Sequence, residues 1–196
     1  MIVLASGSAT RRALLEGAGV TFVVETAAVD EEAVKQAMAA QSADPGPVAS
    51  TLAELKAARV SARHPGRMVV GADQMLDCQG AWYDKPADAA AARLQLLALR
   101  GRTHRLTSAV VAMRDGVRLW HHRQEARLTM RRFSEPFLDD YLARAGAAVL
   151  ASVGAYQLEG LGAQLFSAVE GDHFTILGLP LLPLLDFLRE NGELSS

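Results

Sequence analysis

The spacing of hydrophobic and polar positions changes repeatedly along the chain, and each change marks the boundary of an expected element. Residues 2–5 form a short apolar run typical of a buried strand, and an amphipathic helix is expected to begin near Ser8 after a turn of small residues. Further helices are predicted at residues 30–41, 48–63, 87–99, 134–145 and 179–190. Further strands are predicted at residues 21–25, 68–73, 103–113, 117–130 and 165–169, with Trp82 and Tyr83 on a return strand after a hairpin turn at residues 79–80.

Strands and helices are therefore mixed along the sequence, with hairpins in the second half. This order predicts an α/β fold with an elongated mixed sheet flanked by helices. The Pro- and Gly-rich stretch at residues 44–47 breaks the helical pattern, and residues 45–47 are expected to be a loop rather than a domain linker. Residues 1–196 are expected to form a single domain with two lobes.

Composition narrows the function classes. Half of the 196 residues are apolar, and the formal net charge of −2 argues against a nucleic-acid-binding surface, which is usually basic. The single cysteine, Cys78, excludes an internal disulfide and is expected to be a core residue. The longest apolar segment, residues 176–188, is too short to cross a bilayer, and no secretion signal is recognisable, so a cytoplasmic protein is expected.

Two arginines lie at the predicted start of the first helix. Helix N-termini carry partial positive charge, so Arg11 and Arg12 are unfavourably placed unless an anion offsets the repulsion. We expect this anion to be a phosphate chain, because helix N-termini are ready-made anion-binding sites. The alternative is that both arginines point into solvent, where the penalty is only a few tenths of a kcal/mol.

Asp73 ends an apolar run that is expected to be a central strand. A buried carboxylate is costly without a partner, so we expect a metal ion, a lysine or an arginine beside it. Lys85 precedes Pro86 near the start of the helix predicted at residues 87–99, which would again place a cation beside a helix N-terminus. Lys56 lies on the helix predicted at residues 48–63, where a solvent-directed lysine is the alternative.

Acidic residues at the start of another predicted helix offer further metal ligands. One of Asp30 and Glu31 could join Asp73 in holding Mg²⁺, which commonly uses one or two carboxylates together with substrate phosphates. They could equally be favourable acidic residues in a first turn. No phosphate-binding P-loop, dinucleotide fingerprint or nucleophile elbow occurs in the sequence.

Taken in order, these segments resemble the Maf family of nucleoside triphosphate pyrophosphatases, and the resemblance spans nearly the whole chain. It is carried by residues 4–15, 29–31, 52–57, 71–74, 84–86, 99–104, 154–162, 170–172 and 178–180. The resemblance implies a fold with a central cleft between the two lobes, related to inosine triphosphate pyrophosphatases. It also implies metal-dependent cleavage, with Mg²⁺ or Mn²⁺, of a nucleoside triphosphate to the monophosphate and pyrophosphate.

The family pattern implies a role for each matching position. Asp73 matches the catalytic aspartate, and Asp30 or Glu31 matches the acidic metal position. The positions that line the phosphate cleft match Ser6, Arg11, Arg12, Lys56 and Lys85. Asp73 could act as the base that takes a proton from water or as a ligand of the metal, and the sequence does not separate these roles.

The positions that divide the family by substrate base are Thr10, Gln74 and Glu159 in this chain. Gln74 and Glu159 are similar to the branch that acts on 7-methyl-GTP, whereas the dTTP/UTP branch typically has threonine and glutamine there. Thr10 departs from the tryptophan that the 7-methyl-GTP branch usually carries. A dTTP/UTP pyrophosphatase is therefore the alternative within the enzymes, and a nucleotide-binding regulator of septum formation is the alternative outside them. The apolar strands between residues 103 and 130 could support a homodimer.

Overall fold

The computed structural model describes residues 1–40 and 44–195, which fall into two compact units. Unit 1 comprises Met1–Gln74, Thr107–Gln124 and Asp172–Ser196, and unit 2 comprises Met75–Leu106 and Glu125–Gly171. Three long strands contribute residues to both units: β3 (Val69–Cys78), β5 (Thr103–Arg114) and β6 (Val117–Met130).

The described residues form a seven-stranded mixed sheet in the order β2–β1–β3–β5–β6–β7, with β4 paired to β3. β1 (Ile2–Ala5) lies parallel between β2 (Phe22–Val24) and β3, which explains why all four of its residues are apolar and buried. β4 (Ala81–Tyr83) pairs antiparallel with β3, and β7 (Phe166–Glu170) pairs antiparallel with β6. The predicted α/β fold with a mixed sheet is confirmed.

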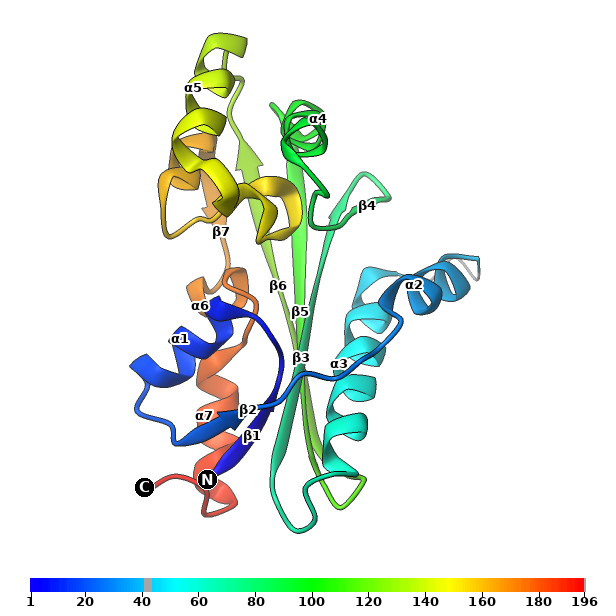
Figure 1. The fold of residues 1–196 in the computed structure, drawn as a ribbon. Coiled ribbons are helices and arrows are strands. Elements are labelled where there is room, and N and C mark those ends of the chain that lie inside the picture. Colours follow the sequence, from blue (N-terminus) through cyan, green and yellow to red (C-terminus); the bar gives the residue numbers. More distant parts are fainter. Residues whose placement is uncertain (41–43, 196) are drawn as a thin grey trace. The chain divides into compact units, whose positions relative to one another are not determined.

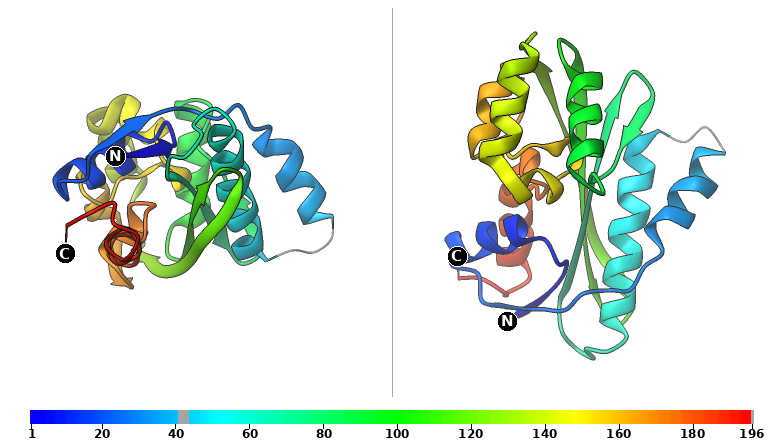
Figure 2. Two further views of the ribbon diagram at one scale, coloured as in Figure 1. Left: turned by 90° about the horizontal axis from the view of Figure 1, so that it is seen from below. Right: turned by 45° about the horizontal axis from the view of Figure 1, so that its top comes forward.

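In unit 1, helices cover both faces of β1 and β3 (Figure 1). α1 (Ala9–Gly17) and α7 (Leu181–Glu190) share one hydrophobic core with these strands and with β5. α3 (Pro45–Ser61) lies on the opposite face, with α2 (Glu31–Ala39) beside it (Figure 2). The short α6 (His173–Ile176) precedes α7 and is capped by Asp172. The buried members of the core are Ile2, Leu4, Leu15, Val20, Met68, Val70, Ala72, Val110, Ala112, Leu179, Leu181, Leu184, Leu185, Phe187 and Leu188.

The predicted loop at residues 45–47 is wrong, because α3 already begins at Pro45. The Asp44 side chain caps this helix by accepting a hydrogen bond from the Gly46 N–H group. The N–H groups of a first turn have no acceptor within the helix, so proline is tolerated there without loss of a hydrogen bond. Proline and glycine therefore mark the start of α3 rather than a break before it.

Other boundaries differ by smaller amounts. The helix predicted to begin near Ser8 is confirmed, with Ser8 as its cap, and the strand predicted to end at Asp73 continues to Cys78. α2 ends at Ala39, and its predicted last residue, Gln41, lies outside the described residues. Among the described residues, 1–40 and 44–195, no helix is both long and apolar enough to cross a membrane.

Unit 2 contains two longer helices, α4 (Ala89–Leu99) and α5 (Glu135–Ala145), which contact each other. Three short 3₁₀ helices follow α5, at Gly146–Leu150, Val153–Ala155 and Leu161–Leu165. Cys78 is buried, and burial raises the pKa of its thiol, as expected for a core residue without a chemical role.

The predicted helix start at residue 87 is also wrong. α4 begins at Ala89, after Asp88, whose side chain accepts a hydrogen bond from the Ala91 N–H group. An aspartate cap satisfies a free N–H group of the first turn, which Pro86 is unable to do. Lys85 therefore lies before the helix cap and not in the first turn.

His104 on β5 is a buried ionisable group of unit 2. Its ring lies tilted against those of Tyr156 and Phe166, and its Nε2 atom lies 2.7 Å from the Tyr156 hydroxyl. Burial lowers the pKa of His104 to about 4, so the ring is neutral in the folded protein above about pH 4.

We expect this burial to make the protein acid-sensitive. The folded protein resists protonation of His104 below the ordinary histidine pKa of about 6.5, so the free energy of unfolding falls as the pH is lowered from about 6.5 to about 4, by about 3 kcal/mol for this group. Urea unfolding of the wild type and of His104→Gln across this range measures the effect. The variant lacks the titration and should lose less stability on acidification. Parallel pH dependences for the two proteins would contradict the prediction.

Candidate active site

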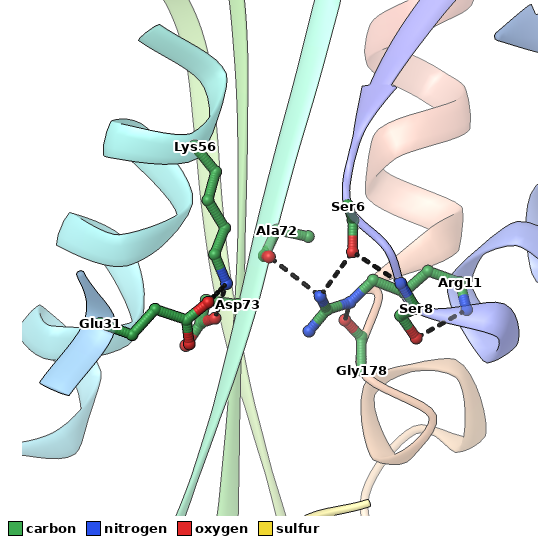
Figure 3. Close-up of polar contacts among 8 residues, drawn as sticks. All are labelled: Ser6, Ser8, Arg11, Glu31, Lys56, Ala72, Asp73 and Gly178. Carbon is green, nitrogen blue, oxygen red and sulfur yellow. Dashed lines mark hydrogen bonds and ion pairs between the residues drawn. The ribbon is translucent and has the colours of Figure 1, made fainter. Parts of the chain in front are cut away.

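The candidate site lies in unit 1, where β3 passes between α3 on one face and α1 on the other. Successive side chains of a strand point to opposite faces, so Gly71 and Asp73 face α3 while Ala72 and Gln74 face the other way. Figure 3 shows this arrangement, with Lys56 and Glu31 on the side of α3 and Arg11 on the side of α1. The strand β3 therefore carries polar side chains on both of its faces, Asp73 on one and Gln74 on the other.

Asp73 is paired with Lys56, which also reaches Glu31. The Lys56 Nζ atom lies 2.5 Å from Asp73 Oδ1 and 2.7 Å from Glu31 Oε1. The Asp73 side chain is only 7% exposed and that of Lys56 12%, so the pair is shielded from water. The expectation that Asp73 has a compensating partner is confirmed, and the solvent-directed alternative for Lys56 is wrong.

The environment of Asp73 changes its proton affinity. Burial raises the pKa of Asp73 above its ordinary value, and the charges of Lys56 and Arg11 counteract only part of this rise. Burial acts in the same direction on Glu31, but there the hydrogen bond and charge of Lys56 prevail and the pKa of Glu31 is lowered. Of the two carboxylates, Asp73 is therefore the better acceptor of a proton.

Gly71 brings α3 close enough for Lys56 to reach Asp73. A Cβ atom on Gly71 would lie 2.2 Å from the Ala53 carbonyl oxygen and 2.8 Å from the Ala57 backbone nitrogen, which is closer than atoms approach. Only glycine permits this packing of the helix backbone against the strand. The residue two positions before Asp73 thus determines the distance between the carboxylate and its lysine.

We expect Gly71→Ala to destabilise the protein by about 3 kcal/mol, because the added methyl group meets backbone atoms that move only with the whole helix. The displacement should also separate Lys56 from Asp73. Urea unfolding measures the first effect. Ala58→Gly is the control, because it tests an exchange between alanine and glycine elsewhere in α3. Gly66→Ala is unsuitable as a control, because Gly66 has a positive φ of 71° and alanine would be strained there. A stability of Gly71→Ala equal to that of the wild type would contradict the close packing.

Arg11 is buried on the other face of β3, although it was predicted at an open helix end. Its Nε atom donates to the Gly178 carbonyl oxygen at 2.7 Å, and its Nη1 atom donates to Ser6 Oγ at 3.0 Å and to the Ala72 carbonyl oxygen at 2.9 Å. Within the part of the chain that the structure describes, Nη2 has no hydrogen-bond partner. The Nε and Nη1 atoms thus join three segments of unit 1, whereas the N–H groups of Nη2 remain donors that a ligand can use.

Gln74 is held by a second set of hydrogen bonds on the same face. Its Nε2 atom donates to Ser108 Oγ at 3.0 Å and lies 3.1 and 3.0 Å from the carbonyl oxygens of Thr175 and Ile176. The amide nitrogen is therefore engaged within the protein. A ligand, including the nucleobase proposed from the sequence, finds only the acceptor Oε1 at this residue.

The structure thus brings together in unit 1 the predicted residues Ser6, Arg11, Glu31, Lys56, Asp73 and Gln74. Asp30 instead caps α2 by accepting the Ala33 N–H group and is exposed, so Glu31 is the acidic residue that lies at the site. Thr10 is half-buried and Arg12 is exposed on α1. Lys85 and Glu159 belong to unit 2, where both are exposed.

The two carboxylates fit a divalent cation. Asp73 and Glu31 converge on one point, because both contact the same Lys56 nitrogen. In the described residues no group of three or more acidic, histidine or cysteine side chains gathers to hold a metal. Two carboxylates suffice for Mg²⁺ when substrate phosphates complete its coordination, so the donor set suits an ion that binds together with a phosphorylated substrate.

Several residues of the site escaped prediction from the sequence. Gly71, Ser108, Thr175 and Gly178 form contacts between segments that are distant along the chain, and small residues carry little local signal. The resemblance quoted above included Gly71 and Gly178 only as parts of motifs. A buried serine inside an apolar strand, Ser108, was the one signal in the residues themselves, because a buried hydroxyl requires a partner.

The comparisons with known proteins agree with one another. The family model described as Maf-like protein matches residues 1–191. A protein of Paramagnetospirillum magneticum named nucleoside triphosphate pyrophosphatase is 70% identical over 192 residues, which cover 98% of this chain and 99% of the relative. A protein of Rhizobium etli named 7-methyl-GTP pyrophosphatase is 50% identical over 193 residues, covering 98% and 97%. With matches along nearly its whole length to the family model and to these relatives, the chain belongs to the Maf family.

Proposed function

We propose that this protein hydrolyses a nucleoside triphosphate to the nucleoside monophosphate and pyrophosphate. The observation that carries the proposal is the buried Asp73–Lys56 pair, with the unpaired edge of Arg11 on the other face of the same strand. This arrangement combines a proton acceptor with cations for a polyphosphate. The names of the relatives from Paramagnetospirillum magneticum and Rhizobium etli support the same activity.

In the proposed reaction a water oxygen bonds to the α-phosphorus, and the bond from that phosphorus to the oxygen bridging to the β-phosphorus breaks. The electron pair leaves with pyrophosphate, and Asp73 accepts the proton of the attacking water. Arg11 Nη2 and Lys56 Nζ neutralise the charge that accumulates on the phosphate oxygens. Lys56 also holds Asp73 and Glu31 in place before the substrate arrives.

Asp73 and Glu31 would hold a divalent cation, Mg²⁺ or Mn²⁺, as the substrate binds. The cation supplies charge neutralisation at the phosphates and lowers the pKa of a bound water. Lys56 must then share the two carboxylates or turn toward the phosphates, because its nitrogen lies where both carboxylates converge. The arginine side chain remains fixed by its three hydrogen bonds.

A substrate panel tests the proposal. Purified protein is incubated with Mg²⁺ and with dTTP, UTP, GTP and 7-methyl-GTP, and the products are separated by chromatography. Monophosphate and pyrophosphate in equal amounts are expected, and reaction in ¹⁸O-labelled water should place the label in the monophosphate. Release of inorganic phosphate with a diphosphate, or turnover of no triphosphate, would refute the proposal.

The proposed substrate is 7-methyl-GTP, acted on in the cytoplasm. Gln74 and Glu159 support this choice through their resemblance to that branch of the family, and the relative from Rhizobium etli carries the corresponding name. A carboxylate at Glu159 suits the N1–H and amino groups of guanine and the positive charge of the methylated base. The alternative is a dTTP/UTP pyrophosphatase, which faster turnover of dTTP than of 7-methyl-GTP would establish.

Glu159→Gln is expected to lower kcat/KM for 7-methyl-GTP by about tenfold and to change dTTP turnover by less than twofold, because the variant loses an acceptor and a charge that only the guanine base uses. Glu159 is exposed, so the melting temperature should stay unchanged. Glu170→Gln, an exposed carboxylate on β7, is the matched control. An identical substrate profile for Glu159→Gln and the wild type would remove Glu159 from base recognition.

A further inference from the structure

Ser108 is a completely buried serine on β5 whose hydroxyl group acts both as donor and as acceptor. It donates to the Thr175 carbonyl oxygen at 2.8 Å and accepts from Gln74 Nε2 at 3.0 Å. We infer that Ser108 is a positioning residue for the hydrolysis, which fixes the Gln74 side-chain amide so that its Oε1 atom faces the ligand side beside Arg11. The inference rests on the proposed function and adds to it a residue that acts through Gln74.

The orientation of the Gln74 amide follows from its partners. Ser108 Oγ and the carbonyl oxygens of Thr175 and Ile176 surround Nε2, at 3.0, 3.1 and 3.0 Å. The carbonyl oxygens are acceptors only, so a rotated amide would place Oε1 against two oxygen atoms. Because the Ser108 hydroxyl donates to Thr175, it too has only a lone pair to offer Gln74. All three partners therefore require the nitrogen on their side.

The same orientation leaves Oε1 facing the space over Gly178, which Arg11 Nη2 also borders. A methyl group on Gly178 would lie 3.4 Å from Arg11 Nη2 and 3.6 Å from Gln74 Oε1, so both atoms border the space over this glycine. No hydrogen-bond partner of either atom is found among residues 1–40 and 44–195. A donor and an acceptor thus border the same space, which suits a phosphate oxygen at Arg11 and a hydroxyl, N–H group or water at Gln74.

A closed ring of hydrogen bonds connects the Gln74 amide to β3, the strand that carries Asp73. Gln74 holds the carbonyl groups at the end of α6, the Gly178 N–H group donates to the Thr175 carbonyl oxygen, and the Gly178 carbonyl oxygen accepts from Arg11. Arg11 in turn donates to the Ala72 carbonyl oxygen, which closes the ring of hydrogen bonds on β3. Ala72 and Gln74 are the two neighbours of Asp73, and loosening the amide therefore loosens the strand on the side opposite Lys56.

The experiment compares two deletions of a buried hydroxyl group on adjacent residues. Ser108→Ala removes the hydroxyl that holds Gln74. Thr107→Val removes the neighbouring hydroxyl, which is equally buried and makes no hydrogen bond with any described residue. We expect kcat for the best triphosphate to fall about tenfold in Ser108→Ala with KM changed by less than twofold, and kcat to stay within twofold in Thr107→Val.

A double-mutant cycle separates positioning from general stability. In a Gln74→Leu background the amide is absent, so Ser108→Ala should lower kcat by less than twofold further. If the fold-decreases in kcat of Ser108→Ala and Gln74→Leu multiply in the double variant, the inference is overturned, because Ser108 would then act independently of Gln74. Equal kinetics of Ser108→Ala and Thr107→Val would overturn it as well. Melting temperatures identify any variant that is partly unfolded under the assay conditions.

A readout without catalysis distinguishes this inference from the proposed function. If the wild type hydrolyses no triphosphate, the proposed function fails, and NMR of the Gln74 side-chain NH₂ group still tests the amide. Slow exchange with solvent is expected in the wild type and in Thr107→Val, and faster exchange in Ser108→Ala. Rapid exchange in the wild type, or the same rate in all three proteins, would refute the role of Ser108 whatever the activity.

Discussion

Asp73→Asn is expected to lower kcat of triphosphate hydrolysis by about 10²- to 10⁴-fold, the range that the loss of a general base produces. An amide has nearly the shape of a carboxylate but accepts no proton from water. Burial raises the pKa of Asp73, so the wild-type rate should begin to fall at a higher pH than an ordinary aspartate would cause as the solution is acidified. This acid limb should be absent from the residual activity of the variant.

Stability measurements decide whether that loss is chemical. Burial has the largest influence on the pKa of Asp73, which means that the ionised carboxylate is costly to the folded protein. Asparagine removes this cost, and Lys56 keeps its contact with Glu31, so the melting temperature should not fall. Asp77→Asn, which alters a half-buried carboxylate of the same strand near Arg105, is the control. A variant that keeps a tenth or more of wild-type kcat would exclude Asp73 as the base.

The sequence predicted the fold well where the signal is local. The cap at Ser8, the paired strands predicted at residues 103–113 and 117–130 and the helix predicted at residues 134–145 depend on short-range chemistry and are confirmed. The starts of α3 and α4 were predicted wrongly for opposite reasons. The prolines that suggest a break before α3 lie in its first turn, whereas Pro86 suggests a helix start that comes two residues before the true start after the Asp88 cap.

The site was predictable in part, because the free-energy cost of burying a charged side chain can be judged for a single residue. A buried aspartate requires a partner, and Lys56 is that partner. The sequence did not predict that Arg11 turns inward, since its three acceptors lie on β1–α1, β3 and the segment after α6, which are far apart along the chain. Nor did it predict the hydrogen bonds of Gln74, which depend on two carbonyl groups that any residue type could supply.

The inward position of Arg11 makes it the second residue whose loss should have a large effect. Arg11→Ala removes the arginine donor from the buried carbonyl oxygens of Ala72 and Gly178 and from Ser6 Oγ, which keeps only the Ser8 N–H group as a donor. Each unsatisfied group costs about 1–3 kcal/mol unless water reaches it, so we expect a loss of about 3 kcal/mol in the free energy of unfolding. The variant also lacks the Nη2 edge proposed to bind phosphate, which should lower kcat/KM by about 10²- to 10³-fold.

Arg11→Lys separates the two contributions of Arg11, because it keeps the positive charge but has no planar group that can hold three acceptors. If charge alone matters, Arg11→Lys should restore most of the activity. If the fixed guanidinium matters, both activity and stability should stay close to those of Arg11→Ala, which is the outcome we expect from its three hydrogen bonds. Arg189→Ala, an exposed arginine of α7 paired with Asp186, provides the control for removing a positive charge from unit 1. Wild-type stability of Arg11→Ala would show that the buried hydrogen bonds do not hold these segments together.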